Sequence, residues 1–461
     1  TLVRRAATVT CYLLPPVTRA LSDYIRNRKR GGVPKERAVA HATRARVALQ
    51  DLGPAFVKMG QALAAREDVL SPEVALELRK LCDQVPPFPV EEARALLEEE
   101  LGASAPAIDG KAIAAASLGQ VYRVNIGGID YAVKVQRPGL AGALAVDVVI
   151  LRGLARYLRK VASLFCTGNL DLVRIVDSWA LTLWHELDYV REAASMDKMR
   201  DELLGKVKGL VIPEVHWKLT SLRVLTTEWI HGRKVTDGGV SDRHIAVGVE
   251  AFAAMILEVG FVHADPHAGN MIITNGNDMC LLDFGMVVEV PESHRRAWAE
   301  CICSLVCGDH GGTLDSLIKI GFFPADCPRA TILPVMSRIW TELVASGSDT
   351  KKRKAAVMKC YDEILTLVRE FQFDLPDYYI VLVRALLTLE GIALASDCQF
   401  DIFKAAFPVA RRSLVSSLSS SQSRRDAAGM VLGAVSRGCR RRASSSSGPS
   451  WRSLVPLAGI V

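Results

Sequence analysis

Two short motifs in the second half of the chain carry residue types suited to phosphoryl transfer. Residues 263–270 read HADPHAGN, in which Asp265 precedes Asn270 by five positions, and an Asp-Phe-Gly begins at Asp283. Carboxylate and amide oxygens are hard ligands of the kind Mg²⁺ prefers, so Asn270 and Asp283 are candidate metal ligands. Asp265 can orient an incoming hydroxyl group or accept its proton. This spacing matches the catalytic loop and DFG of protein kinases.

A lysine and a small-residue loop form the second candidate group. Lys134 is flanked by apolar residues on a predicted strand, and burying its ammonium without a partner is costly. Kinases use such a lysine to bind the α- and β-phosphates. Where they have a glycine-rich loop, this chain has Ala114, Ala115, Ala116 and Ser117. Alanines restrict the backbone, and Ser117 remains as a candidate phosphate or metal contact. A plain small-residue turn is the alternative.

The elements that must position these groups follow from hydrophobic periodicity and turn residues. Helices are predicted up to about residue 101, with a start at Ser71-Pro72 and a last helix over 90–101. Strands and helices then follow in this order: strands 120–124 and 131–135 around Gly127-Gly128, helices 143–164 and 171–204, strands 210–215 and 222–230, and a mostly helical remainder from 243 with strand-loop-strand structure at 270–290.

The charge of the chain is unevenly distributed. The net charge is +7, but residues 1–46 carry +9 and residues 411–452 carry +8, which leaves −10 for the remainder. Basic segments of this kind can bind an anionic membrane, at about 1 kcal/mol per basic residue, or remain solvated without a partner. No nucleic-acid-binding motif accompanies them, so no nucleic acid is expected as a partner. No apolar run reaches the length of a membrane span.

The two basic ends have different compositions. Residues 1–22 contain three arginines and no acid, which suits either the end of an organellar transit peptide or a flexible terminus. Residues 411–461 are rich in Ser and Arg and are predicted to be disordered.

Eleven cysteines indicate a reducing compartment rather than a disulfide framework. Cys301, Cys303 and Cys307 cluster on a predicted helix. Because no second half-site at metal-ligand spacing completes them, buried free thiols are favoured over a zinc site.

Three further motifs complete a family pattern. Residues 58–61 read KMGQ, residues 186–188 read ELD and residues 389–392 read LEGI. Together with the alanine-rich loop and the catalytic loop, they resemble the UbiB/ADCK family of atypical kinases over about residues 47–410. The amino-acid sequence around the motifs is most similar to that of plastid members from plants and algae.

The resemblance implies an α+β, helix-rich, two-lobed protein-kinase-like fold with a helical N-terminal KxGQ extension that lies over the active site. The implied ranges are a basic arm at 1–46, the extension at 47–105, an N-lobe with inserted helices at 106–232, a C-lobe at 233–410 and a basic disordered tail at 411–461.

The resemblance also assigns roles to residues. Lys134 would be the ATP lysine with Glu186 as its helix partner, and Lys58 would be an active-site lysine. The neighbours of Lys58 are apolar, so its ammonium needs water or an anionic partner. Asp265 would be the catalytic aspartate, and Asn270 and Asp283 the metal ligands. The backbone of the hinge would bind adenine at Glu228, Trp229 and Ile230.

The implied function is an ATPase or kinase that binds ATP and Mg²⁺ and supports plastoquinone, tocopherol or ubiquinone metabolism. Its expected partners are a prenylquinone or lipid precursor and an anionic membrane or lipid droplet. The expected location is a chloroplast plastoglobule or thylakoid surface, or alternatively a mitochondrion. Two alternatives stay open: a protein kinase acting on lipid-metabolic enzymes and a non-catalytic nucleotide-binding scaffold. A conventional kinase is disfavoured because the glycine loop and an Ala-Pro-Glu after DFG are missing.

Overall fold

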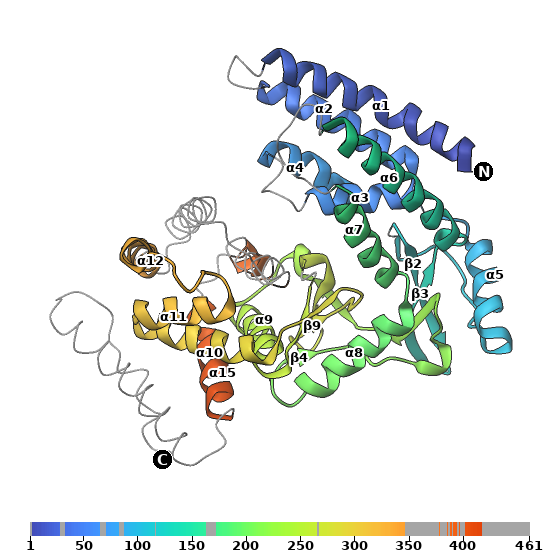
Figure 1. The fold of residues 1–461 in the computed structure, drawn as a ribbon. Helices are drawn as coiled ribbons and strands as arrows, with labels where there is room; N and C mark the ends of the chain where they lie inside the picture. The colour runs from blue at the N-terminus through green and yellow to red at the C-terminus, as the bar shows by residue number, and fades with distance from the viewer. Residues whose placement is uncertain are drawn as a thin grey trace. The chain divides into compact units, whose positions relative to one another are not determined.

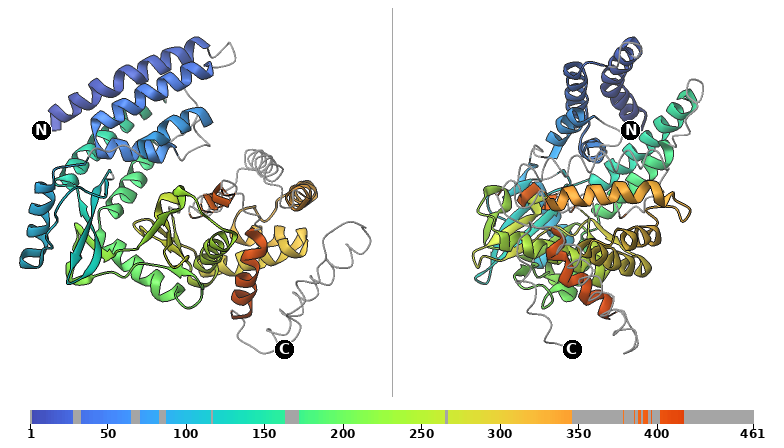
Figure 2. Two further views of the ribbon diagram at one scale, coloured as in Figure 1. Left: turned by 180° about the vertical axis from the view of Figure 1, so that it is seen from behind. Right: turned by 90° about the vertical axis from the view of Figure 1, so that its left-hand side faces the viewer.

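The structure is a computed structural model that is α+β and rich in helices, as predicted. It describes residues 2–27, 33–64, 71–82, 87–115, 117–162, 172–264, 267–345, 378, 385, 388–389, 391–393, 396 and 402–416. The chain forms two compact units (Figures 1 and 2). Unit 1 comprises Thr1–Asp197, Pro213–Trp229 and Asp283–Met286, and unit 2 comprises Lys198–Ile212, Ile230–Leu282 and Val287–Val461.

Unit 1 contains an antiparallel sheet in the order β1-β2-β3-β5. Its strands are β1 (Ala114–Ala115), β2 (Gly119–Ile126), β3 (Ile129–Gln136) and β5 (Val224–Glu228). Gly127 and Gly128, at φ of 62° and 89°, form the predicted β2–β3 turn, because glycine adopts positive φ without steric cost. The sheet places Lys134 opposite Leu225 in the middle of β3.

One face of this sheet packs against helix α5 (Val90–Leu101) (Figure 1). Leu96, Leu97 and Tyr122 belong to the buried cluster between them. The helix has the predicted bounds, because Pro89 precedes its first turn and Gly102, at φ 56°, ends it.

The remaining helices of unit 1 form a second layer with its own apolar core, which includes Phe56, Leu52 and Leu144 (Figure 2). They are α1 (Leu2–Asn27), α2 (Lys35–Leu52), α3 (Pro54–Ala64), α4 (Pro72–Arg79), α6 (Leu140–Ala162) and α7 (Leu172–Glu186). Helix α8 (Tyr189–Leu203) follows α7 and runs from unit 1, whose first segment ends at Asp197, into unit 2. The flexible-terminus alternative for the basic arm is therefore wrong over residues 2–27, which are helical and contribute Val9 to this core.

The helix predicted over 171–204 is wrong in one respect, because it is two helices. The break falls at Leu187 and Asp188, where the Asp188 carboxylate accepts the N–H of Arg191 at 3.0 Å and so caps the new helix. The N–H of Tyr189, at the start of α8, donates to Leu222 O at 3.2 Å. Side-chain capping and a bond to a distant loop thus set the direction of α8.

Unit 2 contains a four-stranded sheet in the order β4-β9-β8-β6 and the antiparallel pair β10-β7. Its strands are β4 (Leu210–Val211), β6 (Gly232–Lys234), β7 (Phe261–His263), β8 (Met271–Thr274), β9 (Met279–Leu281) and β10 (Val287–Glu289). The strand-loop-strand structure predicted at 270–290 is confirmed. The helices are α9 (Asp242–Ala254), the π-helix η6 (Met255–Val259), α10 (Glu292–Cys307), α11 (His310–Ile320), α12 (Arg329–Ala345) and α15 (Ile402–Ser416).

Helix α15 corrects the predicted start of the disordered tail. Residues 411–416 are helical, the Arg412 side chain pairs with Glu258 at 3.0 Å, and the Ser413 hydroxyl donates to Leu257 O at 2.9 Å. These tertiary contacts override the Ser/Arg-rich composition. Residues 417–461 of the predicted tail lie outside the described residues.

The cysteine cluster is helical as predicted. Cys301 and Cys303 are buried in α10, and burial raises the pKa of each thiol to about 12. Among the described residues, no group of His, Cys, Asp and Glu is arranged to hold a metal ion, and no helix is long and apolar enough to cross a membrane.

Candidate functional site

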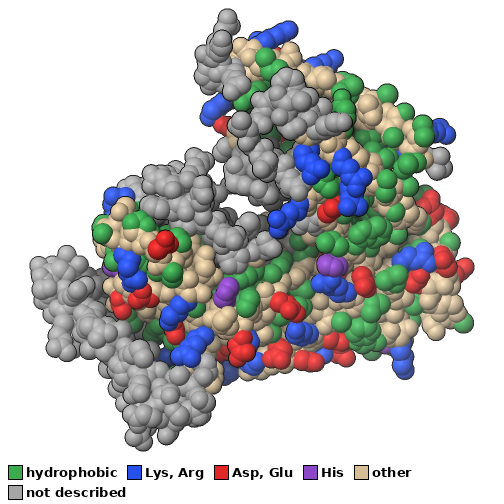
Figure 3. Space-filling view, viewed as in Figure 1, with side chains coloured by type: hydrophobic (Ala, Val, Ile, Leu, Met, Phe, Trp, Pro, Cys, Tyr) green, Lys and Arg blue, Asp and Glu red, His purple; other side chains and the backbone are tan. Residues whose placement is uncertain are grey.

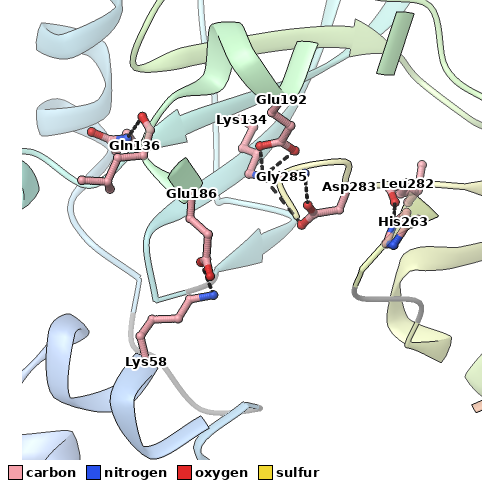
Figure 4. Close-up of polar contacts among 10 residues, drawn as sticks. Lys58, Lys134, Gln136, Glu186, Glu192, His263, Leu282, Asp283 and Gly285 are labelled. Carbon is pink, nitrogen blue, oxygen red and sulfur yellow. Dashed lines mark hydrogen bonds and ion pairs between the residues drawn. The ribbon is translucent and has the colours of Figure 1, made fainter. Parts of the chain in front are cut away.

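Lys134 is held at the centre of a charged cluster in unit 1. Its Nζ lies 2.8 Å from both carboxylate oxygens of Glu192, on α8, and 3.7 Å from Oδ2 of Asp283 (Figure 4). The ammonium also lies 4.9 Å from the centre of the Tyr189 ring, within the range of a cation–π contact. The costly burial of this lysine is therefore compensated by two acids and an aromatic ring.

The prediction that Glu186 partners Lys134 is wrong in this structure, because Glu192 takes that place. Glu186 is the last residue of α7, before the break, whereas Glu192 is inside α8 and its side chain is only 3% exposed. The sequence motifs did not single out Glu192, although a signal for it was present. It lies on the buried stripe of α8 with Tyr189 and Met196, and an acid on an apolar stripe requires a buried partner.

Asp283 follows β9, as the apolar run before it predicted. Its φ of 54° is in the left-handed region, which is uncommon for residues other than glycine and typical of constrained functional positions. The Gly285 N–H donates to Asp283 Oδ1 at 3.1 Å, and Phe284 is fully buried. These contacts fix the backbone while the Asp283 side chain stays 45% exposed.

The cluster carries more negative than positive charge around Lys134. Burial raises the pKa of Glu192 to about 7; Lys134 opposes this shift, while Asp283 and Glu186 add to it. Burial alone would lower the pKa of Lys134, but the carboxylates of Asp283 and Glu192 outweigh it and raise that pKa well above 10.5. Lys134 is therefore a permanent cation, and the surrounding acids favour the arrival of further positive charge.

Lys58, on α3, forms an ion pair with Glu186 (Figure 4). The prediction that the Lys58 ammonium finds an anionic partner is confirmed. The neighbouring Gln61 amide donates to Leu81 O at 3.1 Å. A Cβ on Gly60 would lie 2.3 Å from Leu81 Cδ1, so only glycine allows α3 to pack this closely. The KMGQ residues thus anchor α3 and aim Lys58 at the end of α7.

The alanine-rich loop is the turn between β1 and β2, where Ala115 pairs with Gln120. Ala114 and Ala115 are exposed, while Ala116 lies outside the described residues. Ser117 is only 5% exposed, which does not favour its predicted contact with phosphate or metal.

Two of the predicted hinge residues already use their backbone N–H groups in hydrogen bonds within the protein. The N–H of Glu228 donates to Glu214 O at 2.8 Å, and the N–H of Trp229 donates to Asp130 O at 3.1 Å. An adenine ring would therefore have to bind these two residues through other groups. Ile230 begins the second segment of unit 2.

The catalytic loop belongs to unit 2. Asp265 lies outside the described residues. The His263 Nε2–H donates to Leu282 O at 3.2 Å (Figure 4). The backbone O of Asn270 accepts the N–H of Leu282 at 2.8 Å. Asn270 and Asp283 fall in different units, so their binding of one metal ion stays a prediction.

Comparison with known families and structures identifies proteins that are similar to this chain. The model of the ABC1 atypical kinase-like domain matches residues 80–317. An uncharacterised protein of Synechocystis is 35% identical over 81% of this chain and 56% of its own length. The chloroplastic protein ACTIVITY OF BC1 COMPLEX KINASE 3 of Arabidopsis thaliana is 33% identical over 77% of this chain and 51% of its own length.

The chain therefore spans about half the length of the curated relatives it matches. Among solved structures, the complex of Rv3197 with erythromycin from Mycobacterium tuberculosis aligns with a TM-score of 0.53 at 21% identity. That alignment covers 75% of this chain and 90% of the other, and it shows a shared fold. The family match and the identity to these relatives agree with the motifs described above, and this chain belongs to the ABC1 family of atypical kinase-like proteins.

Proposed function

We propose that this chain binds Mg²⁺–ATP and acts as an atypical kinase or ATPase. The observation that carries the proposal is Lys134, which Glu192 holds at 2.8 Å beside the exposed carboxylate of Asp283. A half-buried lysine fixed by a helix acid next to a DFG aspartate is the arrangement kinases use to bind phosphates.

The residues present fit a metal nucleotide. Two carboxylates, of Glu192 and Asp283, lie beside the single ammonium of Lys134, while Glu186 is paired with Lys58, so the cluster has room for added positive charge. Mg²⁺, when bound, neutralises charge on the phosphates. Asp283 and Asn270 offer the oxygen ligands. Lys134 donates hydrogen bonds to phosphate oxygens, Glu192 keeps its ammonium in place, and Asp265 orients the accepting hydroxyl.

The alanine-rich loop and Lys58 direct the site away from protein phosphorylation. The loop provides Ala114, Ala115 and Ala116 where glycines would let the backbone approach phosphates closely. Lys58 belongs to the KxGQ extension and pairs with Glu186 in the same unit as Lys134. This pairing supports a contribution of the extension to the nucleotide site.

The cellular role we propose is support of prenylquinone metabolism at a membrane or lipid droplet, in the chloroplast. The proposal rests on the resemblance of the motifs and on the chloroplastic names of five plant relatives. ATP turnover of the purified protein, measured with and without liposomes containing quinone-precursor mimics, tests whether a lipid surface stimulates the site.

Thermal unfolding with and without Mg²⁺–ATP tests the nucleotide site directly. Bound ligand stabilises the folded state in proportion to its affinity. Asp283→Asn removes a charged metal ligand and is expected to abolish the Mg²⁺-dependent part of this stabilisation. Asp177→Asn is the matched control, because Asp177 of α7 pairs with Arg152 of α6 at 2.7 Å, in a different ion pair from those around Lys134. Equal stabilisation of the Asp283→Asn variant and the wild type would overturn the assignment.

A further inference from the structure

Helix α1 exposes an apolar strip along most of its length. Val3, Leu14, Val17 and Ile25 are 82%, 54%, 55% and 64% exposed. Their spacing of 11, 3 and 8 residues places them on one side of an α-helix. At 26 residues the helix is about 39 Å long, so the strip extends from one end to the other.

The strip faces outward because another side of α1 is held against unit 1. Val9 and Leu13 of α1 belong to the apolar core of the helical layer. Arg5 donates to both carboxylate oxygens of Asp147 at 2.7 and 2.8 Å and to Leu52 O at 2.6 Å. Rotation of the helix to bury the strip would break this buried ion pair, whose acid is 4% exposed.

Basic side chains border the strip. Arg4, Arg19 and Arg26 are exposed and share a side of the helix next to it. The one acid of α1, Asp23, is turned to α2, where it accepts a hydrogen bond from His41 Nε2 at 2.9 Å. The space-filling view shows apolar and basic side chains along the edge that α1 forms (Figure 3). The exposed charge of this helix is thus entirely positive.

We infer that α1 is the surface through which this protein docks on an anionic lipid surface. A helix with an apolar strip beside arginines lies in the plane of such a surface, with apolar side chains among the acyl chains and arginines at the headgroup phosphates. A strip that extends along the whole helix matches a plane better than a local pocket of a partner protein. The inference rests on the membrane contact of the proposed function and adds the element that makes it.

Co-sedimentation with vesicles separates the two parts of the interface. The vesicles are phosphatidylcholine alone or phosphatidylcholine with phosphatidylglycerol. The apolar variant is Leu14→Gln, Val17→Gln and Ile25→Gln, and the basic variant is Arg4→Gln, Arg19→Gln and Arg26→Gln. The apolar variant is expected to bind at least about tenfold more weakly to the mixed vesicles. The basic variant is expected to lose on the order of 100-fold there, and high salt should reproduce that loss in the wild type.

Matched variants replace the same number of apolar or basic side chains at positions outside α1. The apolar control is Leu76→Gln, Leu204→Gln and Leu222→Gln, and the basic control is Lys111→Gln, Lys208→Gln and Lys218→Gln, all at exposed positions. Both controls should bind vesicles as the wild type does. Thermal unfolding with Mg²⁺–ATP, measured on every variant, confirms that the fold and nucleotide site are intact.

Three outcomes would overturn the inference. The first is that both α1 variants bind vesicles as tightly as the wild type does. If a variant with Arg437→Gln, Arg440→Gln, Arg441→Gln and Arg442→Gln then failed to bind, the membrane contact would belong to the tail. A change from dimer to monomer in the apolar variant with unchanged vesicle binding would make the strip a self-association surface. No vesicle binding by the wild type would remove the membrane contact, while Mg²⁺–ATP stabilisation would still report separately on the nucleotide site.

Discussion

Replacement of Glu192 by Gln is expected to separate stability from nucleotide binding. The substitution keeps the shape of the side chain and removes one of the carboxylates around Lys134. Lys134 keeps Asp283 as a partner at 3.7 Å, so no unpaired buried charge is left behind. This differs from the usual removal of one member of a buried ion pair, which costs about 3–5 kcal/mol.

The pKa of Glu192 sets the size and the sign of the stability change. In the folded protein this pKa is about 7, above the ordinary 4.5, because burial and nearby carboxylates disfavour the ionised form. The ionised carboxylate therefore destabilises the fold. Its cost is absent below pH 4.5, grows between pH 4.5 and 7 and reaches about 3 kcal/mol above pH 7. The stability of the Glu192→Gln variant, relative to wild type, should rise by up to this amount over the same pH range.

Nucleotide binding should change in the opposite direction. Glu192 makes two 2.8 Å charge-assisted hydrogen bonds to Lys134, and such bonds contribute about 1.5–3 kcal/mol. Without them Lys134 is free to move off the phosphate position. The affinity for Mg²⁺–ATP is therefore expected to fall by about 10- to 100-fold. Urea unfolding from pH 4.5 to 8, with calorimetric titration of Mg²⁺–ATP, measures both quantities.

Glu77→Gln provides the matched control. Glu77 is also buried, at 7% exposed, and pairs with Arg46 at 3.0 Å on α2. Hydrogen bonds from Lys80 and Arg46 lower the pKa of Glu77, so its stabilisation is present above the unfolded-state pKa and is lost as pH falls. Its removal should destabilise the protein at neutral pH and leave nucleotide affinity unchanged. If Glu192→Gln behaved in the same way as Glu77→Gln, the Lys134–Glu192 pair would be structural and the reasoning refuted.

Three further substitutions, and Gly153→Ala as a control for the first, test the surroundings of the site. Gly60→Ala should destabilise the protein by about 1–3 kcal/mol, because the added Cβ would lie 2.3 Å from Leu81 Cδ1. Gly153→Ala, whose added Cβ would have no atom within 4 Å, should stabilise it by about 0.5–1 kcal/mol. Equal melting temperatures of the two variants would contradict the α3 packing. Lys58→Ala should alter ATP turnover with an unchanged circular dichroism spectrum, and wild-type turnover would remove α3 from the site. Ala115→Gly should raise nucleotide affinity several-fold and allow autophosphorylation, as isotope transfer from labelled ATP would show, and an inert variant would argue against a phosphate-facing loop.

Local signals in the sequence determined much of the fold. Helix α5 has its predicted bounds because Pro89 and Gly102 act within a few residues of the chain. The hairpin around Gly127 and Gly128 is set in the same way, by residues that adopt positive φ. The Asp and Asn residues of the phosphoryl-transfer motifs, Asp265, Asn270 and Asp283, were also recognisable, because their spacing can be read directly from the sequence.

Tertiary structure decided which charges meet. Glu186 and Glu192 are six residues apart, and the break at Leu187–Asp188 sends the first toward Lys58 and the second toward Lys134. Composition left a flexible terminus open as one of two interpretations of the basic start, and it predicted a disordered tail from residue 411. Instead, Arg5 finds Asp147 and Arg412 finds Glu258, across 142 and 154 positions of sequence. The sequence alone does not distinguish a basic residue in a solvated tail from one in an ion pair. Packing decides between the two, because it brings a distant acid close to the basic side chain.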